Sequence, residues 1–78
     1  MASLGEQLRT GREAASRTIE EAAALTRIPR EHLAALETDD LAALPGPPFT
    51  SGFIRIYGKV LGLQIEPLLD AYREQADA

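Results

Sequence analysis

The chain contains no cysteine, a single histidine and no long hydrophobic run. The lack of cysteine excludes disulfides and thiolate metal sites and is compatible with a reducing cytoplasm. The longest apolar runs fall far short of the roughly 18 residues that a membrane-spanning helix needs. The first residues also lack the basic-then-apolar plan of a signal peptide. We therefore expect a cytoplasmic domain, or a soluble piece of a larger protein.

The residues that an enzyme needs are also missing. His32 is the only histidine, the carboxylates do not cluster at metal-ligand spacing, and no glycine-rich phosphate loop is present. Ser51 has no base near it in the sequence, so it is not supported as a nucleophile. We expect His32 to be a surface helix residue. The chain is predicted to be non-catalytic, without a metal, a cofactor or a small-molecule ligand.

Basic residues are few. The chain has eight Lys and Arg against 12 Asp and Glu, which gives a net charge of −4 and a pI of about 4.8. Duplex DNA binding draws much of its affinity from cations that release counterions from phosphates. Here the cations are scattered among acidic residues, and this pattern disfavours a strong nucleic-acid binder.

Residues 18–37 predict two short helices joined by a tight turn. Thr18 and Glu21 form a capping box, in which each side chain satisfies a backbone N–H at the start of a helix. Pro29 disfavours helical geometry at Ile28 and suits the first turn of the next helix. Apolar residues at helical spacing follow on both sides of the turn. This pattern is typical of a helix-turn-helix.

Three further helices are predicted around this motif. Ser3 and Glu6 form a second capping box at the start of the first helix. Three prolines make residues 45–48 a rigid loop, after which Thr50 or Ser51 can cap an aromatic helix. The last residues of the chain, from Gln75 on, are expected to fray. The 78 residues thus predict one all-α domain with helices at about residues 3–15, 18–25, 29–38, 50–61 and 66–75.

Three of the four aromatic residues lie in the predicted fourth helix. Phe49, Phe53 and Tyr57 are spaced four residues apart and form a ladder along the helix, and Arg55 and Lys59 add a basic edge. Aromatic residues beside a basic edge match the composition of interface hot spots. A helix that is apolar on most of its circumference, however, is usually buried. The ladder is therefore either a docking surface or part of the core, and this choice is most open at Tyr57.

A resemblance to a known family is carried by four segments: LGEQLRTGRE, TIEEAAALTRIPREHLAALE, LPGPPFTSGFIRIYGKVLGL and EPLLDAY. The most specific feature is the Leu-Pro-Gly-Pro loop that leads into the aromatic helix. Over about Leu4 to Tyr72, the chain resembles the cytoplasmic helix-turn-helix domain of the RodZ family of bacterial cell-shape proteins. This family belongs to the wider Xre and phage-repressor superfamily.

The resemblance implies a five-helix repressor-like bundle with a salt bridge between Arg12 and Glu37 that links the first and third helices. It implies docking on the bacterial actin MreB through the fourth helix. RodZ proteins continue into a basic stretch and one transmembrane helix. The chain is then either the N-terminal domain of such a protein, held at the inner face of the cell membrane by an anchor outside it, or a stand-alone paralogue. The implied contact residues are Phe49, Phe53, Tyr57, Arg55 and Lys59.

The alternative function is DNA binding as an Xre-type transcriptional regulator, with the third helix as the recognition helix. Arg30 is suited to a guanine edge, whereas Glu31 repels phosphates and Ala34 offers at best a methyl contact to thymine. We therefore expect at most weak, salt-sensitive DNA binding. A third hypothesis is a dimerisation or scaffold module that uses the aromatic helix. The candidate DNA-contact residues are Arg17, Arg27, Arg30, Glu31 and Ala34.

Overall fold

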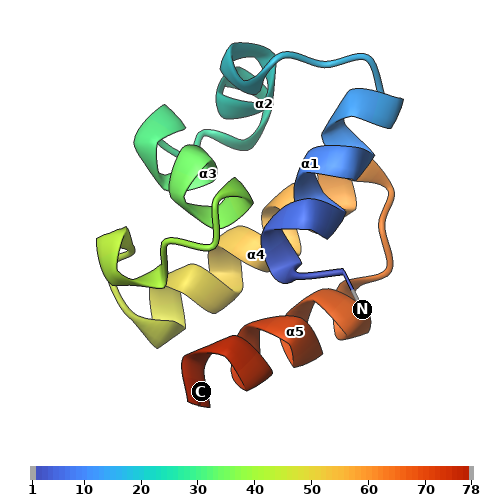
Figure 1. Cartoon of the computed structure of the whole chain (residues 1–78). Coiled ribbons are helices and arrows are strands. Elements are labelled where there is room, and N and C mark those ends of the chain that lie inside the picture. The colour runs from blue at the N-terminus through green and yellow to red at the C-terminus, as the bar shows by residue number, and fades with distance from the viewer. Residues whose placement is uncertain (1, 78) are drawn as a thin grey trace.

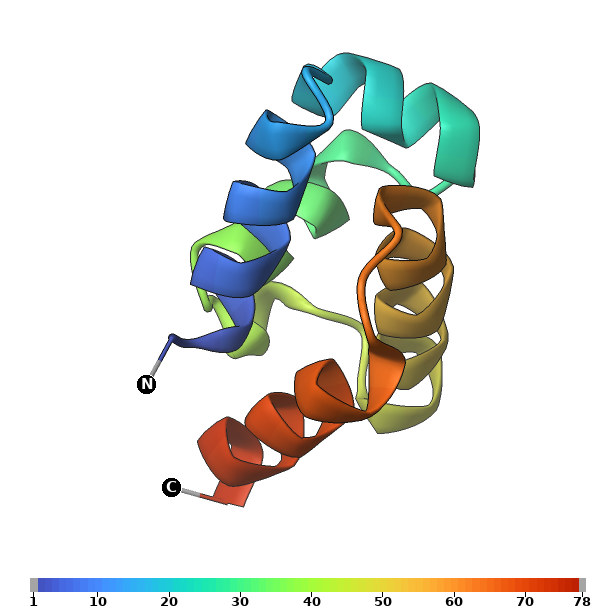
Figure 2. The same ribbon diagram turned by 90° about the vertical axis from the view of Figure 1, so that its right-hand side faces the viewer.

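The computed structural model describes residues 2–77, and within this range the chain folds into five α-helices and one short 3-10 turn (Figure 1). The predicted all-α, five-helix bundle is confirmed. Figures 1 and 2 show α2 at one end of the bundle and α5 at the other. The helices are α1 Leu4–Ala14, α2 Ile19–Thr26, α3 Arg30–Glu37, α4 Pro47–Leu61 and α5 Ile65–Asp77, and the 3-10 turn η1 is Leu41–Ala43.

Both predicted capping boxes are present. At the start of α1, the Glu6 N–H donates to the Ser3 hydroxyl at 3.1 Å, and the Ser3 N–H donates to the Glu6 carboxylate at 3.4 Å. Thr18 and Glu21 make the same reciprocal pair before α2, at 3.1 and 2.8 Å. These bonds satisfy backbone N–H groups that have no partner inside the helix, and so they set where α1 and α2 begin.

The turn of the helix-turn-helix is held by local hydrogen bonds and one buried side chain. The Thr26 hydroxyl donates to the Ala22 carbonyl at 2.8 Å and accepts from the Ile28 N–H at 3.2 Å. Arg27 ends α2 with a left-handed φ of 60°, and Ile28 is buried in the core. Pro29 occupies the position just before α3, without a capping hydrogen bond from its side chain, rather than lying in the first turn of the helix as predicted.

The start of α4 differs from the prediction. Pro47 and Pro48 form the first turn of the helix instead of a rigid loop, because a proline there loses no hydrogen bond. Gly46 precedes them with a φ of 119°, a conformation that favours glycine. Thr50 is not a cap: it is buried within the helix, and its N–H donates to the Gly46 carbonyl at 2.9 Å. Phe49 therefore lies inside α4.

The end of α5 also differs from the prediction. The helix continues to Asp77, so the expectation of fraying from Gln75 is wrong for the described residues, and Ala78 lies outside them. The Gln75 carbonyl oxygen accepts from the Leu4 N–H at 2.8 Å, and its amide group donates to the Asp39 carboxylate at 2.9 Å. The first bond holds the last turns of α5 against the start of α1, and the second ties them to Asp39, which itself accepts from the Gly5 N–H of α1.

The core is built from one face of each helix. Leu41 of η1 and Leu44, which follows η1, pack against this core. No helix of residues 2–77 has both the length and the apolar composition that a bilayer crossing requires. A core of this size is expected to support a free energy of unfolding on the order of a few kcal/mol. Its buried members are Leu4, Leu8, Ala22, Ile28, Leu33, Leu36, Ile54, Tyr57, Leu68, Leu69 and Tyr72.

Candidate functional site

Four apolar side chains of α4 form one row that faces solvent. Phe49 is 63% exposed, Ile56 45% and Val60 36%, and Phe53 between them is half-buried. Steps of four, three and four residues keep all of them on one face of a helix. We call Phe49, Phe53, Ile56 and Val60 the α4 stripe. Contiguous exposed apolar surface on a small domain is a candidate interaction site.

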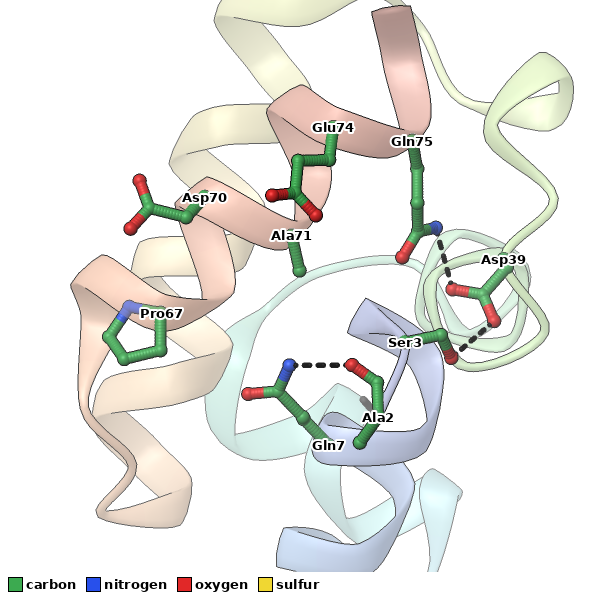
Figure 3. Close-up of a pocket in the computed structure, with 9 residues that line it drawn as sticks. All are labelled: Ala2, Ser3, Gln7, Asp39, Pro67, Asp70, Ala71, Glu74 and Gln75. Atoms are coloured by element: carbon green, nitrogen blue, oxygen red, sulfur yellow. Dashed lines mark hydrogen bonds between the residues drawn. The ribbon is translucent and has the colours of Figure 1, made fainter. Parts of the chain in front are cut away.

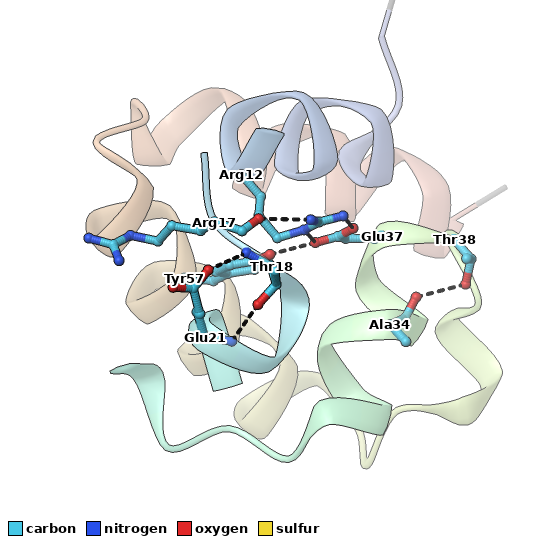
Figure 4. A network of polar contacts seen from close by, with 8 residues as sticks. All are labelled: Arg12, Arg17, Thr18, Glu21, Ala34, Glu37, Thr38 and Tyr57. Atoms are coloured by element: carbon cyan, nitrogen blue, oxygen red, sulfur yellow. Dashed lines mark hydrogen bonds and ion pairs between the residues drawn. The ribbon is translucent and has the colours of Figure 1, made fainter. Parts of the chain in front are cut away.

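Tyr57 belongs to the core and not to the α4 stripe. Its side chain is fully buried, and its hydroxyl donates a short hydrogen bond to Glu37 (Figure 4). A spacing of four residues drifts by about 40° per step around a helix, so the predicted ladder turns inward after Phe53. Tyr57 is therefore not accessible to a partner, and its prediction as a contact residue is wrong. Ile56 and Val60, which were not among the predicted contact residues, continue the exposed row instead. Their spacing from Phe49 and Phe53 fits the 3.6-residue period of a helix, which is the signal that could have identified them.

The two sides of the α4 stripe differ in chemistry. Arg55 and Lys59 are exposed on one side, and no carboxylate of residues 2–77 lies within ion-pair distance of either. On the side of α3, the His32 ring packs against Phe53 with the ring centroids 5.4 Å apart. His32 is half-buried rather than the surface residue that was predicted. The result is an apolar centre with a basic flank.

The predicted salt bridge between Arg12 and Glu37 is present. The Arg12 guanidinium donates twice to the buried Glu37 carboxylate, at 2.8 and 2.9 Å, and once to the Arg17 carbonyl at 3.0 Å (Figure 4). Tyr57 donates to the same carboxylate. Glu37 of α3 thus connects to α1 and to α4, and this network sets how α4 sits on the helix-turn-helix.

This network changes the ionisation of its members. The hydrogen bond to Glu37 raises the pKa of Arg12 above its usual value, although partial burial acts against it. Burial, followed by the hydrogen bond to Glu37, raises the pKa of Tyr57 well above its usual value. Both effects keep Arg12 charged and Tyr57 neutral, which are the states that bind a carboxylate.

Three of the five candidate DNA-contact residues, Arg30, Glu31 and Ala34, lie on α3, whereas Arg17 precedes α2 and Arg27 ends it. Arg30 already pairs with Glu20 of α2, with 2.6 Å between its Nε and the carboxylate. Ala34 is half-buried and has no polar side-chain group. Arg30 is the one cation of α3, and a single cation is too few to follow a phosphate backbone. The other candidates, all exposed, are Arg17, Arg27 and Glu31.

Asp39 is the polar residue that sequence reasoning missed. Its carboxylate accepts from the Gly5 N–H and the Ser3 hydroxyl, each at 2.8 Å, and from the Gln75 amide; Figure 3 shows the bonds to Ser3 and Gln75. A carboxylate at the start of α1 also complements the helix dipole. Burial alone would raise the pKa of Asp39, but these three hydrogen bonds outweigh it and hold the pKa below its usual value.

The substitution Asp39→Asn is expected to remove part of the acid sensitivity of the fold. The folded-state pKa of Asp39 lies below the unfolded value of about 3.9, so its carboxylate stabilises the fold above about pH 4. That contribution is lost as the pH falls through the folded-state pKa. At pH 7 the variant is expected to be less stable by about 1–2 kcal/mol. Urea unfolding followed by circular dichroism between pH 2 and pH 7 measures both effects. Equal pH slopes for the two proteins would contradict the assignment.

No group of His, Asp or Glu in residues 2–77 is arranged to hold a metal ion. Apart from the buried Tyr57, the predicted contact residues lie on two surfaces, the α4 stripe with its basic flank and the region around α3. The first is apolar and open, and it is suited to another protein surface. The second is small and mixed in charge.

Known proteins are similar to this chain in both sequence and fold. The family described as "Helix-turn-helix domain" matches residues 7–68. Cytoskeleton protein RodZ from Streptococcus pneumoniae is 34% identical over 70 residues, which are 90% of this chain and 25% of that protein, so the chain spans about a quarter of this relative. The solved structure of YmfM from Staphylococcus aureus, named as a candidate DNA-binding membrane protein, has a TM-score of 0.85 at 31% identity. That match covers 95% of this chain and 90% of the YmfM chain.

Proposed function

The chain belongs to the helix-turn-helix domain family as a RodZ-like member, and from this premise we propose that it is a non-catalytic cytoplasmic interaction module of a cell-shape protein. The proposed partner is a bacterial actin of the MreB type, and the proposed contact surface is the α4 stripe. In this proposal the parent protein is anchored in the membrane outside this chain, and the domain lies at the inner face of that membrane.

The exposure of the α4 stripe is the observation that carries this proposal. Large apolar side chains in water cost free energy that a partner surface recovers when it covers them. Phe49 is the most exposed of them and follows two prolines in the first turn of α4, so its backbone is already ordered before binding. A pre-ordered aromatic anchor loses little conformational entropy on binding and is typical of a hot spot.

The basic flank is proposed to set the orientation of the partner on the α4 stripe. Arg55 and Lys59 lie along one side of the α4 stripe and have no carboxylate partner in the described residues. Charges at the rim of an interface mainly steer the encounter and select the orientation. The partner surface is therefore expected to present an apolar patch with carboxylates along one side.

The double substitution Phe49→Ala/Ile56→Ala tests this proposal. Both side chains are largely exposed, so the variant is expected to keep its fold while its affinity for MreB filaments falls by at least about tenfold. Co-pelleting with filaments measures the loss, and circular dichroism measures the fold. Leu25→Ala is the matched control, because Leu25 is 51% exposed but lies on α2. The proposal is wrong if the folded double variant pellets like the wild type, or if Leu25→Ala loses as much.

DNA binding through α3 is the competing proposal, and the name of YmfM supports it. On this chain two exposed carboxylates lie beside Arg30, those of Glu20, with which it forms a weak exposed pair, and of Glu31. Both features oppose the approach of a phosphate backbone. The domain is therefore expected to bind a duplex weakly at most, with an affinity that falls as salt rises.

A further inference from the structure

An open groove of about 940 Å³ lies between the start of α1 and α5 (Figure 3). Small side chains, those of Ala2, Pro67 and Ala71, form part of its lining. The carboxylates of Asp70 and Glu74 project along α5 beside them (Figure 3). The hydrogen bonds among Ser3, Asp39 and Gln75 hold α5 against the start of α1, so the groove is already formed in the isolated chain.

A row of carboxylates extends along α5 beside this groove. Steps of four, four and three residues place the four side chains on one face of the helix, and all four are exposed. Like charges at this spacing disfavour a helix, and a cationic partner relieves that cost. Arg73, a cation on the same helix, pairs with Asp70 at 3.0 Å, but both are more than half exposed and such a pair contributes little. We call Glu66, Asp70, Glu74 and Asp77 the acidic row.

The same chain carries a surface that complements the acidic row. The α4 stripe runs from Phe49 to Val60, and the acidic row runs over the same number of residues, so each is about 16 Å long. Arg55 and Lys59, on the flank of the stripe, are four residues apart, as are successive carboxylates of most of the row. The α4 stripe is apolar, has large exposed side chains and is basic at its edge. The groove is hollow, is lined in part by small side chains and is acidic at its edge.

We propose that the α4 stripe of one copy of the chain docks on the groove and acidic row of a second copy. In this contact the large side chains of the stripe cover the small side chains of the groove. Arg55 and Lys59 pair with carboxylates of the acidic row. Polyanions are unsuited to this groove, because all the ionisable side chains that line it are acidic. The contact also covers the α4 stripe, so self-association competes with any other partner of that surface.

A charge-swap experiment tests the contact. We expect Arg55→Glu/Lys59→Glu, with a net charge of −4 − 4 = −8, and Asp70→Lys/Glu74→Lys, with −4 + 4 = 0, each to weaken self-association by at least about tenfold. The quadruple variant has the wild-type net charge and opposite charges at the contact again, so it is expected to recover self-association to within a few-fold. Sedimentation equilibrium at chain concentrations up to about 1 mM measures the association, which for so small an interface is expected to be weak.

The matched control is Glu13→Lys/Glu31→Lys, which makes the same change in net charge at two exposed positions on α1 and α3. It is expected to keep wild-type self-association or to strengthen it slightly. A wild type that stays monomeric at 1 mM, a control that weakens as much as Asp70→Lys/Glu74→Lys, or a folded quadruple variant that does not recover would each overturn the proposal.

The inference shares the α4 stripe with the proposed function but does not need the actin-like partner. Asp70→Lys/Glu74→Lys leaves the stripe unchanged, so this variant is expected to co-pellet with MreB filaments at least as well as the wild type. If this variant no longer pelleted with the filaments, the acidic row would also take part in filament binding, and the assignment of filament binding to the α4 stripe alone would be wrong. Self-association without pelleting by the wild type would refute the proposed partner alone, and pelleting without self-association would refute this inference alone.

Discussion

The substitution Glu37→Ala is expected to lower the free energy of unfolding by about 3–5 kcal/mol. It leaves the Arg12 guanidinium, whose side chain is only 16% exposed, without its counter-charge, and it removes the acceptor of the buried Tyr57 hydroxyl. A domain of this size has a stability on the order of a few kcal/mol, so the variant is expected to be largely unfolded at 25 °C. Urea unfolding at pH 7, followed by circular dichroism, measures the change.

The control for this prediction replaces both charges together. Arg12→Met/Glu37→Leu puts apolar side chains of similar size where the ion pair stood, and it is expected to be far more stable than Glu37→Ala. The remaining cost is that of the Tyr57 hydroxyl without its acceptor, about 1–3 kcal/mol, and adding Tyr57→Phe is expected to recover most of it. If Glu37→Ala costs less than about 1 kcal/mol, the ion pair does not control how α1, α3 and α4 fit together.

The substitution Gly5→Ala is expected to destabilise the fold by about 2–3 kcal/mol. A β-carbon at this position would overlap the Glu37 carbonyl oxygen and would lie 2.7 Å from the carbonyl carbon and 2.9 Å from the Asp39 carboxylate. Relief requires α1 to move away from α3, which breaks the 2.8 Å hydrogen bond from the Gly5 N–H to Asp39. The melting temperature is expected to fall by about 4–8 °C for each kcal/mol lost.

Gly5→Ala is expected to lower the stability, whereas replacing a glycine by alanine inside a helix ordinarily raises it. Alanine is favoured over glycine inside a helix by up to about 1 kcal/mol. Gly52 of α4 provides the comparison, because nothing lies within 4 Å of the place its β-carbon would take. Gly52→Ala is therefore expected to raise the melting temperature while Gly5→Ala lowers it. A rise in both variants would refute the close approach of α1 and α3.

The elements that the sequence predicted well are those whose stabilising contacts lie within a few residues. The capping boxes at Ser3 and Thr18 each depend on a partner three residues away, and the turn around Ile28 depends on its neighbours Thr26 and Pro29. The salt bridge between Arg12 and its distant partner was implied by family resemblance, since spacing alone does not bring two helices together. The start of α4 was missed because proline is compatible with a loop and with a first helical turn, and only the helix that follows decides between them.

The sequence by itself determined that this protein is a small all-α domain with a helix-turn-helix, few cations and one aromatic helix, because composition, caps and periodicity are local properties of the chain. The tertiary structure decided which face of α4 meets water. The hydrogen bond between Tyr57 and Glu37 joins residues 20 positions apart and turns Tyr57 inward, which leaves Phe49, Ile56 and Val60 exposed. The tertiary structure likewise brought Asp39 and Gln75 to the start of α1. Contacts between residues so far apart depend on how the helices pack, and no local pattern encodes them.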